Sequence, residues 1–441
     1  WFSSEIKPLL TVSGYSPTPN LEALYHFLSF NYIPGSLTAY NDIYELRPGH
    51  RLELKYGDKE PKIKSYFDIN YKINPELNKL ECVHKSLDYL TKAVERQLIS
   101  DVPVGVMLSG GMDSSALVAL TAKVRGNSDF HTFSIGFEDH SFDEAPYARI
   151  VANHIGTTHH EILITPDKVL EYLPKYLSYI DEPYADGSAI PTYLLSKCAK
   201  EYVTVLLSGE GGDEFFTGYD THPAFLVRKY YRKLPKLMRQ RFIRPLVDFM
   251  PVSHKKLSFE FKAKRFVRGA ELDVPNAHFF WRVVLSEDVK KSVLNQPDRF
   301  ERFSYSDQFF EKAYNRCKSA DELNRLLYID FSYHLPDDLM IKNDRMTMAH
   351  SLEARVPFTD IDLVKFLSTV PSKYKMNHLQ AKYLLREAMR DYLPNKIINK
   401  KKVGLEMPYS SWLRNEMREL AEDVLSKSNL NSTGLFNGSN V

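Results

Sequence analysis

Between residues 77 and 207, the hydrophobic positions follow two different spacings in turn. Apolar, often β-branched runs predict buried strands at 103–108, 130–137, 160–164 and 203–207. Segments with apolar residues three and four positions apart predict amphipathic helices at 77–98, 113–120, 143–154, 166–180 and 190–201. Because strands that alternate with helices require right-handed crossovers, this pattern predicts an α/β fold with a doubly wound parallel sheet.

The two flanks of this region have other patterns. Residues 1–76 contain one short amphipathic helical stretch and a few alternating apolar positions, which is typical of the tail of a β-rich domain. Too few strands are predicted there to close a sheet of their own. Beyond Tyr219 the strand patterns stop, and residues 222–441 predict helices interrupted by prolines. We therefore expect two units, residues 1–76 and 77–441, the second with a large helical C-terminal part.

Composition narrows the class of protein. The chain has 441 residues, 43% of them hydrophobic, which can bury a sizeable core. A formal net charge of +2 gives no electrostatic argument for nucleic acid or a membrane surface as partner. Cys82, Cys198 and Cys317 lie far apart without metal-ligand spacing, so we expect a reducing compartment, with the cytoplasm as the default. Because the first residue is Trp1 rather than Met, we also expect a fragment of a longer chain.

A glycine-rich stretch, Ser109-Gly-Gly-Met-Asp-Ser114, follows the first predicted strand. Its two glycines allow a sharp turn and a close approach of the backbone to a ligand. Free N–H groups at the start of the next helix make such a turn an anion site, although a tight turn without a ligand is the alternative. The Walker A and G-x-G-x-x-G spacings are both absent. Asp113 favours a phosphate site that includes Mg²⁺, because a carboxylate beside phosphate is repulsive without a cation.

A second glycine-rich stretch, Ser208-Gly-Glu-Gly-Gly-Asp-Glu214, follows the strand predicted at 203–207. Acids in glycine-rich turns are often simple turn formers, which is the alternative to a functional role. Ligands of doubly wound sheets lie at the carboxyl ends of the strands, where both glycine-rich stretches are expected. The functional interpretation places Asp213 beside Asp113 on Mg²⁺, with Glu210 near the reacting carboxylate.

Other charged residues favour structural interpretations when judged by spacing alone. Lys382 lies on one helical face with Arg386, and a solvated lysine is the commoner situation. Lysines 400–402, before Val403, predict a solvated turn rather than a phosphate-facing loop. Glu353 and Arg355, in a charged set that also includes Lys342, favour an internal ion pair. The pair His159-His160 lies on a predicted strand, so its two side chains point to opposite faces and cannot share a metal.

Five motifs together resemble the synthetase domain of the glutamine-hydrolysing asparagine synthetases. The first also resembles the pyrophosphate loop of the ATP pyrophosphatase (PP-loop) enzymes, whose fold is of the adenine nucleotide alpha-hydrolase type. The motifs are Ser109–Ser114, Asp181–Pro191, Ser208–Glu214, Asp344–Met348 with Ser351–Phe358, and Lys382 of Lys-x-x-Leu-Arg. Residues 1–76 resemble the end of that family's N-terminal glutaminase domain, an α+β domain of the Ntn-hydrolase type. Thr359 and Thr217 depart from the family, which usually has leucine and glycine there.

The resemblance implies an AMP-forming carbon–nitrogen ligase that uses ATP and Mg²⁺. A substrate carboxylate, expected to be that of aspartate, attacks the α-phosphorus of ATP, and ammonia then displaces AMP to give the amide. The implied pyrophosphate ligands are Ser109, Gly110, Gly111 and Ser114, and the implied Mg²⁺ ligands are Asp113 and Asp213. The adenine is expected near Met107, Leu108 and Ile135, with Ser208 and Gly209 nearby. Lys382 would stabilise negative charge in the reaction, and Glu210 would position ammonia or take its proton.

Several alternatives stay open at this point. The same chemistry could amidate another carboxylate or close a ring, as in β-lactam and lasso-peptide cyclases. A catalytically idle scaffold is a third interpretation, against which the intact Asp113, Asp213, Glu210 and Lys382 argue. The family's glutaminase uses an N-terminal cysteine, whereas position 1 here is tryptophan, so glutamine hydrolysis is not supported for this chain. A homodimer, like the identity of the acceptor, is left open.

Overall fold

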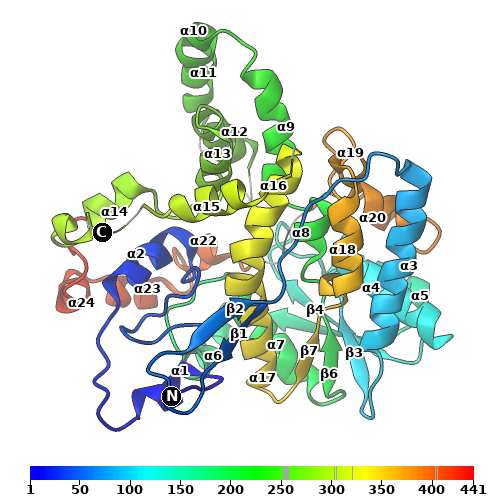
Figure 1. Ribbon diagram of the computed structural model, residues 1–441, viewed down its shortest axis with the longest axis horizontal. Helices are drawn as coiled ribbons and strands as arrows, with labels where there is room; N and C mark the ends of the chain where they lie inside the picture. Colours follow the sequence, from blue (N-terminus) through cyan, green and yellow to red (C-terminus); the bar gives the residue numbers. More distant parts are fainter. Residues whose placement is uncertain (252–257, 302, 304, 320, 403, 405) are drawn as a thin grey trace.

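A five-stranded parallel sheet forms the centre of the larger part of the molecule (Figure 1). The computed structural model describes residues 1–441 except 252–257, 302, 304, 320, 403 and 405. The strands are β3 Val104–Met107, β4 His131–Phe137, β5 Thr158–Ile164, β6 Val205–Leu207 and β7 Glu353–Arg355. Their order is β5-β4-β3-β6-β7, and every neighbouring pair is parallel, which confirms the predicted α/β class.

The strand order reverses between β3 and β6. From β3 the chain adds β4 and β5 on one side, whereas β6 and β7 extend the sheet on the other. The carboxyl ends of β3 and β6 therefore flank a topological switch point, where open α/β sheets bind their ligands. Both glycine-rich stretches begin there, directly after these two strands.

Strand β7 corrects the expectation that residues beyond Tyr219 are helical throughout. It pairs with β6 in register from Val205–Glu353 to Leu207–Arg355. A strand of three residues with a charged residue at each end has no apolar alternation, so the sequence pattern could not reveal it. The expected pair between Glu353 and Arg355 is confirmed, with 2.7 Å between Arg355 Nε and Glu353 Oε1.

Helices cover both faces of the sheet, because strand residues alternate between two apolar clusters. Val205 and Leu207 join one cluster with α3 Lys79–Gln97, α4 Met112–Arg125 and α5 Ala145–Ile155. Leu206 faces the other cluster, which includes residues of α6 Pro166–Tyr179 and α7 Ala189–Ala199. These strands and helices agree with the predicted elements to within a few residues.

The rest of the described chain after β6 is mainly helical. Helix α16 (Glu322–Ile329), the π-helix η3 (Asp330–Met340) and α17 (Ile341–Met348) form one long rod, yellow in Figure 1. Pro336 lies inside the widened η3, and wide turns of this kind are frequent at functional sites. The other elements are α8 Gly212–Phe216, α9 Thr221–Tyr231, α10 Lys236–Met238, η1 Arg239–Ile243, α11 Arg244–Asp248, α12 Phe259–Gly269, α13 Val274–Phe280, α14 Glu287–Val293, η2 Pro297–Phe300, α15 Gln308–Arg316, η4 Pro357–Thr359, α18 Ile361–Thr369, α19 Ser372–Lys375, α20 Tyr383–Ala388, α21 Asn395–Ile398, α22 Tyr409–Trp412, α23 Arg418–Val424 and α24 Lys427–Ser432. Within the described residues, no helix is both long and apolar enough to span a bilayer.

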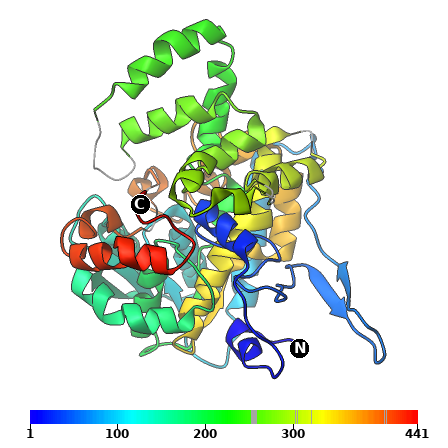
Figure 2. The same cartoon turned by 90° about the vertical axis from the view of Figure 1, so that its left-hand side faces the viewer.

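The N-terminal segment packs closely on the helical part. It contains α1 Ile6–Leu10, α2 Leu21–Phe30 and the antiparallel strands β1 His50–Glu53 and β2 Lys62–Ser65, whose hairpin projects from the body in Figure 2. Tyr25 of α2 packs against Leu294 and Phe300. Farther along, the carboxylate of Asp337 pairs with Arg47 and accepts a hydrogen bond of 2.7 Å from the Gly35 N–H. This segment is therefore held to the helical part of the molecule by charge as well as by apolar contact.

A carboxyl group at this junction makes stability depend on pH. Glu182 accepts a hydrogen bond of 2.9 Å from the Ala39 N–H, and burial raises the pKa of Glu182 to about 8. A free glutamate has a pKa of about 4.3. Between these two pKa values the Glu182 carboxyl is therefore protonated in the folded protein and ionised in the unfolded protein. The stability that this bound proton gives the folded protein is lost as pH rises toward 8. We predict that Glu182→Gln, which keeps an oxygen acceptor for Ala39, flattens the fall in unfolding free energy between pH 6 and 8, measured by urea denaturation. The exposed Glu138→Gln is the control, and equal slopes in both variants would contradict the prediction.

Candidate functional site

A cavity of about 1140 Å³ opens at the carboxyl ends of β3, β4 and β6. All but one of the expected site residues line it. Those residues are Met107, Leu108, Ser109, Gly111, Asp113, Ser114, Ile135, Ser208, Gly209, Glu210, Asp213 and Lys382. The exception, Gly110, lies in the same loop, and its carbonyl oxygen is 3.2 Å from the amine of Lys400. The fold thus gathers residues from three distant parts of the sequence at the switch point.

The first glycine-rich loop is closed by its own serines. The Ser109 N–H donates to Ser114 Oγ at 3.1 Å, and the two hydroxyl oxygens are also 3.1 Å apart. Gly110 has a φ of +68°, and a Cβ there would lie 2.5 Å from the backbone nitrogen of Ala148. Helix α4 begins directly after Gly111, which has no side chain to cap the first N–H groups. The N-terminus of α4 therefore faces the cavity with donors available to an anion.

The second glycine-rich loop lies against the first. A Cβ on Gly209 would be 3.2 Å from the Cβ of Asp113, and one on Gly212 would overlap the Asp113 carboxyl group. Only residues without side chains let the two loops approach this closely. As a result, Asp113 from the β3 end and Asp213 from the β6 end face a common space.

Lys382 fills the space between these two carboxylates. Its amine pairs with Asp113 and lies 2.5 Å from Asp213 Oδ1, and only 6% of the residue is exposed. The residue has a φ of +56° at the start of α20, and its N–H donates to the carbonyl of Phe216 at 3.1 Å. Spacing alone favoured a solvated lysine, and this interpretation was wrong. Helical periodicity cannot show that the first turn of a short helix points into a cavity.

Charges in this group stabilise one another. Burial alone would lower the pKa of Lys382, but Asp113 and Asp213 raise it above its ordinary value, so the ammonium group stays charged. Burial raises the pKa of Asp113, although Lys382 acts against this. Burial also favours neutral Asp213, yet Lys382 and Lys402 together lower the pKa of Asp213 below its ordinary value.

The donor set fits a magnesium ion. Mg²⁺ prefers oxygen ligands and usually takes one or two carboxylates together with phosphate oxygens. Asp113 and Asp213 supply two largely buried carboxylates beside the first glycine-rich loop, and Asp113 Oδ1 is a buried atom without a hydrogen-bond partner in the described structure. Such an orphaned acceptor next to a helix N-terminus is suited to a cation that bridges protein and phosphate.

The lysine run 400–402 does not form the expected solvated turn. The Lys400 amine contacts the Gly110 carbonyl oxygen and pairs with Glu144, and Lys402 pairs with Asp213. Both lysines thereby add positive charge beside the two glycine-rich loops. A run of three lysines has the same sequence pattern on an exposed surface and at a binding site, so only the tertiary contacts show which of the two it forms. Val403, which follows the run, lies outside the described residues.

A second charged group, missed in the sequence, lies farther along the cavity. The Lys342 amine is 3.6 Å from both Asp186 Oδ2 and Glu210 Oε1, and it is 2.9 Å from Ser188 Oγ. Asp338 of η3 lines the same region and accepts a hydrogen bond of 2.6 Å from the Tyr184 hydroxyl. An internal pair was expected for Glu353 and Arg355, whereas Lys342 of the same charged set pairs with acids outside that set, one of them the expected site residue Glu210. Asp186 lies inside the second family motif, which could have indicated this.

The N-terminal segment also contributes to the cavity wall. Phe30, Asn31 and Tyr32 line it, and the Ala185 N–H donates to the Asn31 carbonyl oxygen at 2.9 Å. Nothing in the local sequence indicated this, because the segment has a different hydrophobic pattern from the rest of the chain.

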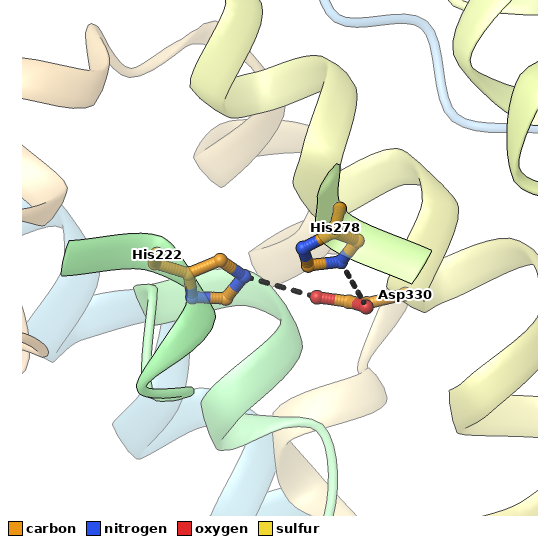
Figure 3. A group of neighbouring side chains, drawn as sticks. All are labelled: His222, His278 and Asp330. Carbon is orange, nitrogen blue, oxygen red and sulfur yellow. Dashed lines mark hydrogen bonds and ion pairs between the residues drawn. The ribbon is translucent and has the colours of Figure 1, made fainter. Parts of the chain in front are cut away.

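Two histidines and an aspartate form a buried group on α9, α13 and η3 (Figure 3). Asp330 Oδ2 is 3.0 Å from His222 Nε2, and Asp330 Oδ1 is 3.0 Å from His278 Nε2. Arg282 also donates to Oδ1, at 2.7 Å. Burial favours neutral Asp330, but Arg282 and the histidines lower the pKa of Asp330 well below its ordinary value. A guanidinium already neutralises this carboxylate, so we assign the group to joining α9, α13 and η3 rather than to metal binding.

The two neighbouring histidines of β5 behave as expected. His159 makes side-chain contacts of 2.9 Å with Thr132 and 3.0 Å with Ser134, whereas His160 contacts His131 at 2.9 Å. The two side chains point to opposite faces of the sheet, so they share no ligand.

Comparison with known proteins identifies relatives over most of the chain. The family model described as asparagine synthase matches residues 85–441. Asparagine synthetase (glutamine-hydrolyzing) 1 of Bacillus subtilis is 32% identical over 97% of this chain and 65% of that protein. Asparagine synthetase (glutamine-hydrolyzing) 3 of the same organism is 27% identical over 91% and 60%, and amidase chyE of Penicillium rubens is 25% identical over 90% and 63%. The chain therefore spans about three fifths to two thirds of the length of these relatives.

The tight packing of the first loop can be tested at Gly110. We predict that Gly110→Ala destabilises the protein more than Gly126→Ala does. Both glycines have a positive φ, of +68° and +69°, but a Cβ on Gly126 would have no other atom within 4 Å. The conformational cost of about 1 kcal/mol is shared, whereas overlap with the Ala148 backbone adds about 1–3 kcal/mol in Gly110→Ala alone. Urea denaturation measures the difference, and equal losses in the two variants would show that the loop is not packed as described.

Proposed function

Because the chain belongs to the asparagine synthase family, we propose that it is an ATP-dependent, AMP-forming ligase that joins ammonia to a carboxylate. The proposal rests above all on one observation: Lys382 forms ion pairs with both Asp113 and Asp213 at the switch point of the sheet. Aspartate is the acceptor that we propose first, with asparagine as the product. ATP is the proposed co-substrate, with Mg²⁺ as the proposed metal ion.

We propose that ATP lies across the ends of β3 and β6. The adenine would contact backbone at Met107, Leu108 and Ile135, with Ser208 and Gly209 nearby. Ser109, Gly110, Gly111 and Ser114 would hold the β- and γ-phosphates through the loop and the first N–H groups of α4. Lys400, which contacts the Gly110 carbonyl, supports this placement by adding positive charge beside the loop. Asp113 and Asp213 would hold Mg²⁺, which supplies charge neutralisation between carboxylates and phosphates.

In the first step that we propose, a carboxylate oxygen of the acceptor attacks the α-phosphorus. The bond from the α-phosphorus to the bridging oxygen breaks, and pyrophosphate leaves with its electrons. Lys382 remains protonated beside this position, so it would stabilise negative charge that grows in the transition state. The result is an acyl-adenylate.

In the second step, ammonia attacks the acyl carbon and AMP leaves. The attacking nitrogen must lose a proton, and Glu210 is the carboxylate that we propose to position ammonia or accept that proton. The contact of Glu210 with Lys342, at 3.6 Å, supports this role because it holds the carboxylate in place at the cavity wall. Amide and AMP are released.

The acceptor could be a different carboxylate. The relative named amidase chyE shows that members of similar length and identity include a protein not named for asparagine synthesis. Amidation of another acid, or ring closure, would use the same adenylation step and different residues around the acceptor. A catalytically idle scaffold is the remaining alternative, and the charged group of Asp113, Asp213 and Lys382 argues against it.

We further propose that residues 1–76 are the end of a glutaminase domain and that residues 77–441 are the synthetase domain. Glutamine would supply ammonia in the complete protein. Burial raises the pKa of all three cysteine thiols, which disfavours any of them as a nucleophile for glutamine. We therefore expect this chain to use free ammonia. A cytoplasmic location is proposed from the three separated cysteines, which are all free thiols. Whether the protein is a homodimer is left open.

The reaction class can be tested through its products. With ATP, Mg²⁺, ammonia and aspartate, we predict AMP, pyrophosphate and asparagine in equal amounts, separated by chromatography. Asp113→Asn and Asp213→Asn should each lower the rate roughly 100-fold or more, because each removes a charge at the metal and phosphate site. The exposed Asp129→Asn is the matched control. Formation of ADP and phosphate would refute the proposal, and activity with another acid but not aspartate would change only the acceptor.

A second test concerns Lys382. If it stabilises charge mainly in the transition state, Lys382→Ala and the uncharged Lys382→Met should lower kcat roughly 10²–10³-fold while changing ATP affinity much less. Arginine should not restore the rate, because a planar guanidinium does not replace the compact ammonium group that lies between the two carboxylates.

The control for this test is Lys365→Ala, which removes an exposed lysine of α18. Adenylate formation is measured by exchange of labelled pyrophosphate into ATP, and ATP affinity by equilibrium binding. Near-normal exchange in both Lys382 variants would return Lys382 to a purely structural role.

A further inference from the structure

Residues 228–251 and 258–270, which we call the arm, project from the body of the molecule. Helices α10 and α11, with η1 between them, form the far end of the arm in both views (Figures 1 and 2). The arm has a small apolar cluster of its own, formed by Tyr231, Val267 and Ala270. Its far end therefore has a stable shape while remaining largely surrounded by solvent.

One face of the far end carries an uncovered apolar stripe. Met238, Phe242, Leu246 and Phe249 follow one another at intervals of three and four residues, so they share one side of the helix. Their exposed fractions are 41%, 67%, 74% and 87%. The neighbouring positions Ile243 and Val247 pack instead against the cluster of the arm. The stripe is thus not needed to hold the arm together.

Charge in the molecule is concentrated in the same place. Residues 228–268 contain fourteen lysines and arginines but only two acids, a net charge of +12, whereas the whole chain has +2. The remaining residues therefore carry a net charge of −10. Because the net charge of the whole chain is only +2, this local concentration of positive charge is not apparent from the overall composition.

Part of this charge is available beside the stripe. Arg232 and Arg239 pair with Glu271. Lys236 and Arg241, which lie on the same helix as the stripe, are exposed, and no ion pair involves either of them within the described residues. A helix that combines exposed Phe and Leu with unpaired Lys and Arg is typical of segments that lie in a membrane interface.

We propose that the far end of the arm binds the surface of an anionic lipid bilayer. The stripe would enter the boundary between headgroups and acyl chains, and Lys236 and Arg241 would contact the anionic headgroups. A nucleic acid would neutralise the charge but would leave Met238 and Leu246 in water. A second copy joined arm to arm would bring two groups of like charge together. An anionic bilayer would bury the apolar stripe and would also neutralise the basic side chains beside it.

The proposal can be tested by sedimentation of the 441-residue chain with vesicles. We expect binding to phosphatidylcholine vesicles that contain phosphatidylglycerol, little binding to phosphatidylcholine alone, and weaker binding as salt rises. The variant Phe242→Ser/Leu246→Ser/Phe249→Ser should bind at least about 10-fold more weakly. Lys236→Gln/Arg241→Gln should bind roughly 25-fold more weakly at low salt, because each basic residue near such a surface contributes about a fivefold change.

A matched control replaces three exposed apolar residues outside the arm, Leu80, Ile99 and Val424, with serine. It should bind vesicles as the original chain does, and unfolding midpoints of all variants show whether each has folded. Absence of binding to anionic vesicles, or binding unchanged in the stripe variant, would overturn the proposal. So would a stripe-dependent dimer in sedimentation velocity, or binding to duplex DNA that exceeds binding to the vesicles.

Discussion

The pairing of Lys382 with Asp113 and Asp213 is the interaction on which the arrangement of the site depends. Two buried carboxylates that face each other are unfavourable unless positive charge lies between them. In the structure that charge comes from a lysine at the start of α20, far from both acids in the sequence. We propose that the same two carboxylates hold a metal ion, in which case Lys382 must either share this space with the ion or move out of it.

The surrounding structure serves to bring these three residues together. The switch point between β3 and β6 places the two glycine-rich loops side by side, and glycines at positions 209 and 212 allow Asp113 to approach. Thr217 has a left-handed φ of +63°, which is unusual for a β-branched residue. It directly precedes Gly218, which lies against both Asp213 and Lys382.

Much of this could be predicted from the sequence. Alternating strand and helix patterns gave the α/β class, and the two glycine-rich loops indicated the switch point with its carboxylates. Strand β7 escaped prediction because three residues with charged ends have no periodicity. Lys382 and Lys400 were judged solvated because a helix or a lysine run has the same local pattern at a surface and at a site. The contribution of Asn31 to the cavity depends on packing between segments of different pattern, which no local signal reports.

The central claim is that an acceptor carboxylate attacks the α-phosphorus of ATP at this site. The most direct measurement follows an oxygen label from the carboxylate into the products. If an acyl-adenylate forms and ammonia then attacks its acyl carbon, one labelled oxygen must leave on AMP with the bond between carbon and oxygen broken. Mass spectrometry of AMP from ¹⁸O-labelled aspartate, or from whichever acid supports AMP formation, is predicted to show one heavy oxygen in its phosphate. Label in inorganic phosphate, or unlabelled AMP accompanied by labelled amide alone, would contradict the account.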